Sequence, residues 1–162
     1  MTYYDEIAEG YDELHKAEQL EKISLIKLFA RPKIDDKLLD VGCGTGITTE
    51  PWDCKRFGID PAEKLIERAK QKDKIEYKIA KAEKIPYPDN EFDYVISITA
   101  IQNFDDIEKG IKEMKRVGKE KFIISALRKS KKIDTIRKLI ARYFISYKEI
   151  EEKKDFIFLI GL

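Results

Sequence analysis

The residues with the clearest potential for chemistry are an acid and three alternating glycines in the segment Asp40-Val-Gly42-Cys-Gly44-Thr-Gly46. They follow a short apolar run, so the pattern predicts a buried strand that leads into a sharp turn. Because glycines lack Cβ atoms, they let the backbone turn tightly and come close to a ligand. In an open α/β sheet, such a turn lies at the carboxyl end of a strand, where ligands bind.

The spacing of the glycines distinguishes between cofactors. A dinucleotide fingerprint would need a third glycine at position 47, where this chain has Ile47, and a phosphate-binding P-loop would need a following lysine. A second acid, Asp60, ends the next expected strand 14 residues after Gly46. Its carboxylate could accept hydrogen bonds from the vicinal hydroxyls of a ribose, or it could cap a helix that starts at Pro61. The glycine turn before it favours the ribose.

The elements that must position these residues alternate between strands and helices. Two helices are expected across residues 3–30, where Gly10 and His15 are candidate interruptions and Pro32 ends the helical run. Residues 47–53 can hold at most a short helix. The other expected elements are strands at 37–42 and 55–60, a helix at 62–71, strands at 75–79 and 92–98, a helix at 107–117 capped by Gly118, a strand at 122–127, a helix at 134–144, and strands at 145–150 and 156–160.

This order predicts an α/β fold with a mostly parallel sheet and an antiparallel hairpin at the C-terminal edge. The chain has 162 residues, a mass of 19.0 kDa and 43% hydrophobic residues, so one domain can bury a core without disulfides or a structural metal. Cys43, Cys54 and His15 are too few for a zinc site without carboxylates, and no metal is expected. No apolar run spans a bilayer, and the N-terminus is too acidic for a signal peptide. We therefore expect a cytoplasmic protein, with a thermophile-like abundance of Lys, Glu and Ile.

Charge is distributed unevenly along the chain. The formal net charge is +1, which excludes a uniformly basic nucleic-acid binder. Residues 1–108 hold 16 Lys and Arg against 24 Asp and Glu, whereas residues 109–162 hold 16 against 7. The basic residues are densest over 128–142, directly after an expected strand. This stretch either attracts phosphates or forms a solvated lysine-rich surface.

Three segments, DVGCGTG, FGIDPAEKLIERAK and AEKIPYPDNEFDYVIS, occur in order within residues 38–127. Together they resemble the class I S-adenosylmethionine-dependent methyltransferases, especially the type 11 and ubiquinone/menaquinone-type domains. YDEIAEGYD at residues 4–12 is similar to the N-terminal helix that many of these enzymes carry. The resemblance implies an enzyme with a Rossmann-like seven-stranded sheet, helices on both faces, and S-adenosylmethionine as its cofactor. It also implies one minimal domain over residues 1–162, with the helical segment 1–30 covering the pocket.

The resemblance further implies roles for individual residues. Tyr4 or Tyr11 would close the pocket, or would simply pack within the helix. No catalytic residue is assigned, because a sulfonium is already a good leaving group and the protein mainly aligns the reactants. The implied contacts are Asp40, Gly42, Gly44 and Gly46 to the methionine moiety, Asp60 to the ribose, Pro61 or Ala62 and Ala82 with Glu83 to the adenine, and Ile98 with Thr99 to the reacting end.

Two departures from the family pattern affect this assignment. Many relatives have an acid before the Ala-Glu pair, where this chain has Lys81. The segment from Gly46 to Asp60 is also a few residues short, and its Trp52 is expected in the core rather than over the pocket.

The methyl acceptor is expected to be RNA or another anionic macromolecule, because the basic stretch lies on the same sheet edge as the pocket. Candidate substrate contacts are Gln102, Asn103, Arg128 and Lys129, although Gln102 and Asn103 could equally cap a helix. One alternative is a small-molecule methyltransferase that acts on a quinone or another metabolite. Another is a non-catalytic subunit that binds the cofactor. The chain could also form a homodimer or need an activating partner protein.

Overall fold

The computed structural model describes the backbone of residues 3–71 and 74–162 and the side chains of residues 12–71 and 74–162. All the strands expected from the sequence are present, with shifts of a few residues at their ends. The elements are α1 (Tyr3–Ile26), β1 (Lys37–Val41), β2 (Lys55–Asp60), α2 (Glu63–Ala69), β3 (Ile75–Ile79), β4 (Phe92–Ser97), the 3-10 helix η1 (Ile101–Asn103), α3 (Ile107–Val117), β5 (Gly118–Leu127), α4 (Ile133–Tyr143), β6 (Tyr147–Glu151) and β7 (Asp155–Ile160).

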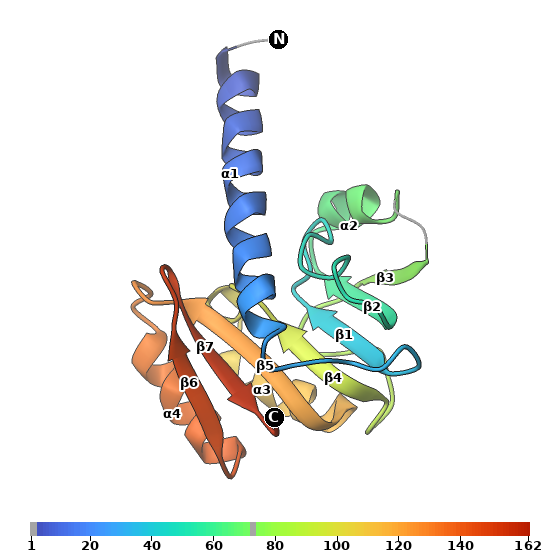
Figure 1. Ribbon diagram of the computed structural model, residues 1–162, viewed down its shortest axis with the longest axis vertical. Coiled ribbons are helices and arrows are strands. Elements are labelled where there is room, and N and C mark those ends of the chain that lie inside the picture. The colour runs from blue at the N-terminus through green and yellow to red at the C-terminus, as the bar shows by residue number, and fades with distance from the viewer. Residues whose placement is uncertain (1–2, 72–73) are drawn as a thin grey trace.

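The strands form one seven-stranded sheet in the order β3-β2-β1-β4-β5-β7-β6. The first five strands in this order are parallel, and β7 is antiparallel to both β5 and β6. Helices α3 and α4 lie behind the sheet in Figure 1, and the C-terminal end of α1 lies in front of it. The predicted α/β architecture with an antiparallel C-terminal hairpin is therefore confirmed. The parallel strands bring the turns after β1, β2, β4 and β5 to one edge.

Two apolar layers hold the helices on the sheet. Behind it, Ile111 of α3 and Ile140 of α4 pack in the same cluster as Leu39. In front, Ile26 of α1 packs with Leu38. Neighbouring leucines belong to different layers because successive side chains of a strand point to opposite faces. Burying each such side chain stabilises the fold by about 1.5–3 kcal/mol, so both faces of the sheet contribute to the core.

The prediction of two helices across residues 3–30 is wrong, because residues 3–26 form one continuous helix. Gly10 lies within it; a glycine in a helix interior costs only about 1 kcal/mol relative to alanine. The C-terminal end of α1 is anchored by Ile23 and Ile26, and the helix ends before Pro32. Its N-terminal half stands away from the sheet (Figure 1). Neither α1 nor any other helix in the described part of the chain is long and apolar enough to cross a bilayer.

Gly118 is the C-cap residue of α3, as expected, and its amide donates to the Met114 carbonyl oxygen, but it is not in the left-handed conformation. Its φ of −92° is extended, and it begins β5, which starts earlier than expected. A Cβ at this position would lie 2.5 Å from Cε1 of Phe122 and 2.8 Å from Cγ2 of Val95. Glycine is required here because the strand packs closely, since the extended backbone at this helix end would accept any residue.

The described residues between β1 and β2 contain no helix, as the short spacing indicates. Trp52 fills part of this region and is 1% exposed. Its indole Nε1 donates a hydrogen bond to the Thr48 carbonyl oxygen at 3.0 Å. Trp52 is therefore a core residue that holds the segment after the glycine turn against the sheet.

Candidate functional site

The turn after β1 has the conformation that alternating glycines allow. The φ angles of Gly42, Gly44 and Gly46 are +78°, +56° and +89°. All three lie in a region where a residue with a Cβ is strained. The Gly42 amide donates to the Ile59 carbonyl oxygen at 2.8 Å, which fixes the turn to the end of β2.

Asp60 connects this turn to the segment that begins α2. Its Oδ2 accepts a hydrogen bond from the Gly44 amide at 3.0 Å, and its Oδ1 accepts one from the Ala62 amide at 2.8 Å. A carboxylate has about four lone-pair sites, so two remain for a ligand hydroxyl. Asp60 therefore stabilises the turn, and its carboxylate can also accept hydrogen bonds from a ligand.

The three glycines differ in what surrounds them. A Cβ on Gly46 would lie 2.3 Å from the Tyr77 hydroxyl oxygen, and one on Gly42 would lie 2.6 Å from the Ala100 Cβ. A Cβ on Gly44 would meet no atom within 4 Å. Gly42 and Gly46 are thus required for packing, whereas Gly44 borders open space that a ligand can fill.

Asp40 lies beneath the turn and is fully buried. Its Oδ2 accepts hydrogen bonds from the hydroxyl groups of Thr48 and Thr49, both at 2.7 Å. Burial raises the pKa of Asp40 to about 6, although these two hydrogen bonds act in the opposite direction. Asp40 therefore supports the turn from inside the protein, at a position away from the pocket surface.

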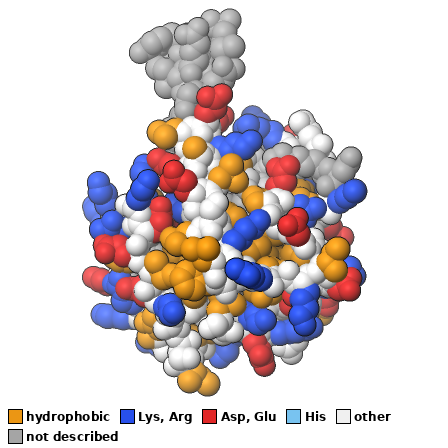
Figure 2. Space-filling view, viewed as in Figure 1, with side chains coloured by type: hydrophobic (Ala, Val, Ile, Leu, Met, Phe, Trp, Pro, Cys, Tyr) orange, Lys and Arg blue, Asp and Glu red, His pale blue; other side chains and the backbone are white. Residues whose placement is uncertain are grey.

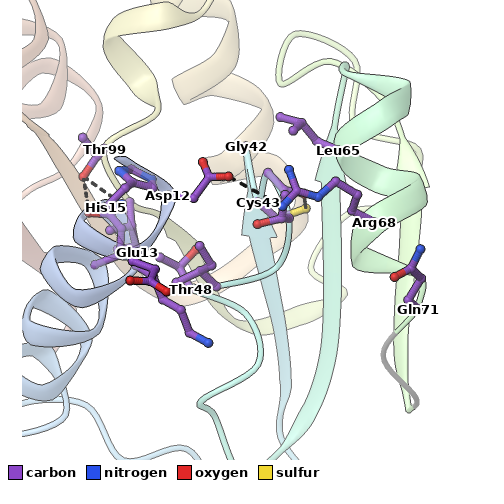
Figure 3. A pocket seen from close by; sticks show the side chains of 16 residues that line it. Asp12, Glu13, His15, Gly42, Cys43, Thr48, Leu65, Arg68, Gln71 and Thr99 are labelled. Carbon is purple, nitrogen blue, oxygen red and sulfur yellow. Dashed lines mark hydrogen bonds and ion pairs between the residues drawn. The ribbon is translucent and has the colours of Figure 1, made fainter. Parts of the chain in front are cut away.

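A pocket of about 490 Å³ lies beside the turn. Residues of α1 form one side and residues of α2 the other, with the glycine turn between them (Figure 3). Across the pocket, Oδ2 of Asp12 in α1 lies 4.0 Å from Nη2 of Arg68 in α2. The lining residues are Asp12, Glu13, His15, Lys16, Gln19, Gly42, Cys43, Gly44, Thr45, Ile47, Thr48, Leu65, Arg68, Gln71, Ile98 and Thr99.

The predicted cofactor residues occupy three kinds of position. Gly42, Gly44 and Thr99 line the pocket, as does the neighbouring Ile98. Asp40, Gly46 and Asp60 stabilise the turn but do not line the pocket. The adenine candidates lie away from the pocket surface: Pro61 is exposed, Ala82 is buried in the core, and Glu83 accepts a hydrogen bond from the Asp106 amide at 2.9 Å. Tyr4 and Tyr11 lie outside the described side chains.

Lys81, which replaces the acid found in many relatives, forms an exposed ion pair with Asp105 at 2.9 Å. It therefore holds the loop after β3 to the segment before α3. No feature of this contact directs Lys81 toward the pocket.

None of the four substrate candidates lines the pocket. Gln102 is 7% exposed and donates a hydrogen bond to the Thr99 carbonyl oxygen at 2.9 Å, while Asn103 is exposed. Arg128 pairs with Glu151 at 2.6 Å. Lys129 is exposed, with no hydrogen bond or ion pair to the described part of the chain. Gln102 and Arg128 thus already have structural roles.

The sequence analysis expects the helical segment 1–30 to cover the pocket, but it does not name the side chains with which α1 lines it. Asp12, His15, Lys16 and Gln19 all line it. Their positions follow the i, i+3, i+4, i+7 spacing of one helix face. This polar periodicity is visible in the sequence, but it marks a functional face only once α1 is placed beside the glycine turn.

Comparison with known proteins identifies the family. The methyltransferase domain model matches residues 39–124, which is more than half of the chain. The ubiquinone biosynthesis O-methyltransferase of Pelagibacter ubique is 33% identical over 128 residues, which cover 72% of this chain and 52% of that protein. The chain spans about half the length of the curated relatives it matches.

Solved structures share the fold. A Methanococcus maripaludis protein aligns with a TM-score of 0.77 and 18% identity, covering 95% of this chain and 91% of that one. A chain in a Haloferax volcanii complex with the Trm112 methyltransferase activator aligns with a TM-score of 0.61 and 19% identity, covering 76% of this chain and 57% of that one.

The match to the family model runs from within β1 to within β5 and includes the glycine turn and Asp60, the segments on which the sequence resemblance rests. The expectations of a methyltransferase family, of its S-adenosylmethionine cofactor and of an enzymatic fold are confirmed at this level. The chain belongs to the class I S-adenosylmethionine-dependent methyltransferases, in the methyltransferase domain family.

Proposed function

We propose that this chain transfers a methyl group from S-adenosylmethionine to a small molecule bound in the pocket beside the glycine turn. The main support for this proposal comes from Gly44. A Cβ added at this position would point into open space at the edge of a pocket of about 490 Å³. This volume is within the range of roughly 300–1,000 Å³ for small-molecule sites. The residues therefore fit a ligand that approaches the backbone closely.

The protein's part in this reaction is alignment. Bound S-adenosylmethionine supplies a methyl group on a positively charged sulfonium. We assign the glycine turn to the methionine moiety, Asp60 to the ribose hydroxyls, and Ile98 with Thr99 to the end where the acceptor meets the methyl group. Holding both reactants in line and excluding water lowers the barrier without a dedicated base, provided that the nucleophile arrives deprotonated.

The contacts of the basic stretch favour a small molecule over RNA. Arg128 is engaged by Glu151, and Arg137 pairs with Glu149 at 2.7 Å. Both guanidinium groups also lie over the Phe156 ring, at 5.7 and 4.9 Å. On the face of the molecule shown in Figure 2, acidic and basic side chains are interspersed. A quinone or similar metabolite agrees with the name of the Pelagibacter relative.

An anionic macromolecule is the second candidate. Lys129, Lys131 and Lys138 are exposed and have no acidic partner in the part of the chain that the structure describes. They follow β5, whose carboxyl end is at the same sheet edge as the glycine turn. Three unpaired cations near a transfer site would attract phosphates.

The test uses methyl-labelled S-adenosylmethionine, the purified protein, and a cell extract separated into small-molecule, RNA and protein fractions. We expect label in the small-molecule fraction. Label in RNA instead would overturn the acceptor class and make the three lysines the next targets. Calorimetry with S-adenosylhomocysteine provides the control, because a protein that fails to bind it cannot be a methyltransferase of this kind.

A partner protein is the remaining element of the proposal. Binding of S-adenosylhomocysteine without transfer of label would favour a missing activator or a binding-only role. Adding back the protein fraction separates these two cases, because an activator restores transfer and a binding-only subunit stays inactive.

A further inference from the structure

A buried polar cluster lies where α1 meets the sheet, next to the pocket. We call it the Lys22 cluster, and its members come from α1, the end of β4, β5 and β7. Two of them, Gln19 and Thr99, line the pocket. The cluster consists of Gln19, Lys22, Thr99, Ser125 and Asp155.

The centre of the cluster is an ion pair removed from water. The side chains of Lys22 and Asp155 are 2% and 0% exposed, and Lys22 Nζ lies 3.1 Å from Asp155 Oδ1. Asp155 Oδ2 accepts hydrogen bonds from the hydroxyls of Thr99 at 2.6 Å and Ser125 at 2.8 Å. Burying two charges is costly unless they are paired and hydrogen-bonded, and these contacts meet that requirement.

The cluster fixes the orientation of the Gln19 amide. An ammonium group only donates hydrogen bonds, so the Gln19 oxygen must face Lys22 Nζ, which lies 2.8 Å away. The amide nitrogen then faces Thr99 Oγ1 at 3.3 Å. The Thr99 hydroxyl hydrogen is directed to Asp155, so Thr99 Oγ1 accepts from Gln19. One N–H of Gln19 is used here, and the second has no partner within the described part of the chain.

We propose that Gln19 is a specificity-determining residue that donates this second N–H to a carboxylate or carbonyl oxygen of the methyl-accepting molecule. Lys22 and Asp155 are the positioning pair that holds the donor in place. The inference rests on the proposed function and narrows its substrate class. Thr99 lies two residues after the end of β4, at the end of the pocket assigned to the acceptor, and Gln19 donates a hydrogen bond to it.

The apolar residues nearby suit a ring that bears such an oxygen. Ile98 precedes Thr99, and Ile47 lies across the glycine turn; both line the pocket. Benzoate, which joins a carboxylate to an aromatic ring, is therefore a suitable probe. Benzylamine is the matched control because it keeps the ring and replaces the oxygen acceptor with a donor.

The side-chain amide of Gln19 can be observed directly. The chain has three glutamines, Gln19, Gln71 and Gln102, so protein labelled with 15N at the glutamine side chain gives three pairs of N–H signals, and Gln19→Met identifies the pair from Gln19. With the protein saturated with S-adenosylhomocysteine, we expect benzoate to shift the Gln19 signal and benzylamine to leave it in place. No shift with benzoate would overturn the proposal. So would a shift caused by S-adenosylhomocysteine with no further response to benzoate.

Variants separate donation from packing. Gln19→Met and Gln19→Glu both remove the N–H, and Glu keeps an oxygen for Lys22. Both should weaken benzoate binding about tenfold, the effect of one charge-assisted hydrogen bond, as measured from the Thr99 backbone amide. The control is Glu21→Gln, which breaks the exposed pair with Lys153 at 3.4 Å and should leave binding unchanged. Benzoate binding of wild-type strength in both Gln19 variants would refute the donor.

The positioning role of Lys22 can be tested separately with variants of that residue. Lys22→Arg keeps the charge and should retain the wild-type Gln19 signal, whereas Lys22→Met should move it and weaken benzoate binding. An unmoved signal in folded Lys22→Met would remove Lys22 from the proposal, and if that variant does not fold, the Gln19 variants carry the test. None of these measurements needs turnover. Benzoate bound through Gln19, with no label transferred even after the protein fraction is added back, would therefore refute the proposed function and leave the donor established.

Discussion

Two acids flank the glycine turn, and their surroundings give them different roles. Asp40 is fully buried and contacts the hydroxyls of Thr48 and Thr49. Asp60 is partly exposed and contacts the backbone amides of the turn and of the following segment. Asp40 thus supports the turn from inside the protein. Asp60 can contact a ligand, because of the two acids only Asp60 is accessible to solvent.

Replacement of Asp60 should weaken the binding of S-adenosylhomocysteine. Asp60→Ala removes the acceptor of the Gly44 amide and of the ligand hydroxyls, at a cost of about 1–3 kcal/mol of binding free energy. Isothermal calorimetry measures the change, and Asp53→Ala, at an exposed acid just before β2, is the control. Equal affinity in Asp60→Ala and the wild type would contradict the ribose assignment.

Asp40 should make stability depend on pH. Burial raises its pKa in the folded protein from 3.8 to about 6, so folding favours the protonated form. Its contribution is complete below about pH 4 and is lost as pH rises to about 6, a loss of about 3 kcal/mol. Asp40→Asn cannot titrate, so the wild type should lose stability relative to this variant over that range. Urea unfolding at pH 4, 5, 6 and 7 tests this, and parallel profiles would disprove it.

At the scale of elements, the glycine turn and α1 define the pocket together. The turn provides a backbone that a ligand can approach, and α1 provides the facing wall with Asp12, His15 and Gln19. The wall depends on the Lys22 cluster, which attaches the C-terminal end of α1 to β4, β5 and β7. The pocket is therefore formed by a local conformation and by a contact between distant segments.

Two alanine substitutions in the turn should differ in their main effect, which is on stability for Gly46→Ala and on S-adenosylhomocysteine binding for Gly44→Ala. Both Gly44→Ala and Gly46→Ala place a Cβ at positive φ, at a cost of about 1–2 kcal/mol in unfolding free energy. Gly46→Ala should cost about 1–3 kcal/mol more, because its Cβ meets the Tyr77 hydroxyl. Gly44→Ala should instead weaken S-adenosylhomocysteine binding at least tenfold, since its Cβ enters the ligand space.

Denaturant unfolding and calorimetry on both variants separate stability from binding. Adding Tyr77→Phe to Gly46→Ala should recover part of the lost stability by removing the closest contact. If Gly44→Ala bound S-adenosylhomocysteine like the wild type, the cofactor would not lie against this turn.

Across the whole molecule, the uneven charge of the sequence is largely compensated by the fold. Lys119 pairs with Asp93 at 3.1 Å and Lys154 with Glu18 at 2.7 Å, so basic residues of the C-terminal part meet acids of the N-terminal part. Exposed pairs of this kind contribute about 0–1 kcal/mol each. Their main consequence is that less positive charge remains for a phosphate-bearing acceptor than the sequence indicates.

Removing the three unpaired lysines should not affect transfer to a small molecule. In Lys129→Gln/Lys131→Gln/Lys138→Gln, we expect label incorporation equal to the wild type and an unfolding free energy within about 1.5 kcal/mol, as for exposed substitutions. The control is the equivalent triple change at Lys33, Lys64 and Lys70, which are also exposed. A selective loss of labelling in the first variant would favour the anionic macromolecule.

Local features explain why much of this fold was predictable. β1 and β4 are apolar runs with clear ends, and the turn contains glycines at alternate positions, so periodicity and spacing identify both. The continuous α1 was not predictable in the same way. Gly10 and His15 lower local helix propensity, and packing of Ile23 and Ile26 on the sheet compensates for it.

The α/β class, the family and the acids beside the turn were predictable from the sequence, because these depend on residue type and short-range spacing. Three features become visible only in the folded chain: Asp40 is buried, Arg128 is paired, and Gln19 and Lys22 of α1 contact Thr99 and Asp155. Gln19 and Lys22 lie about 80 to 130 positions from these partners in sequence. Such contacts arise from the order of strands and the seating of α1, which no local pattern specifies.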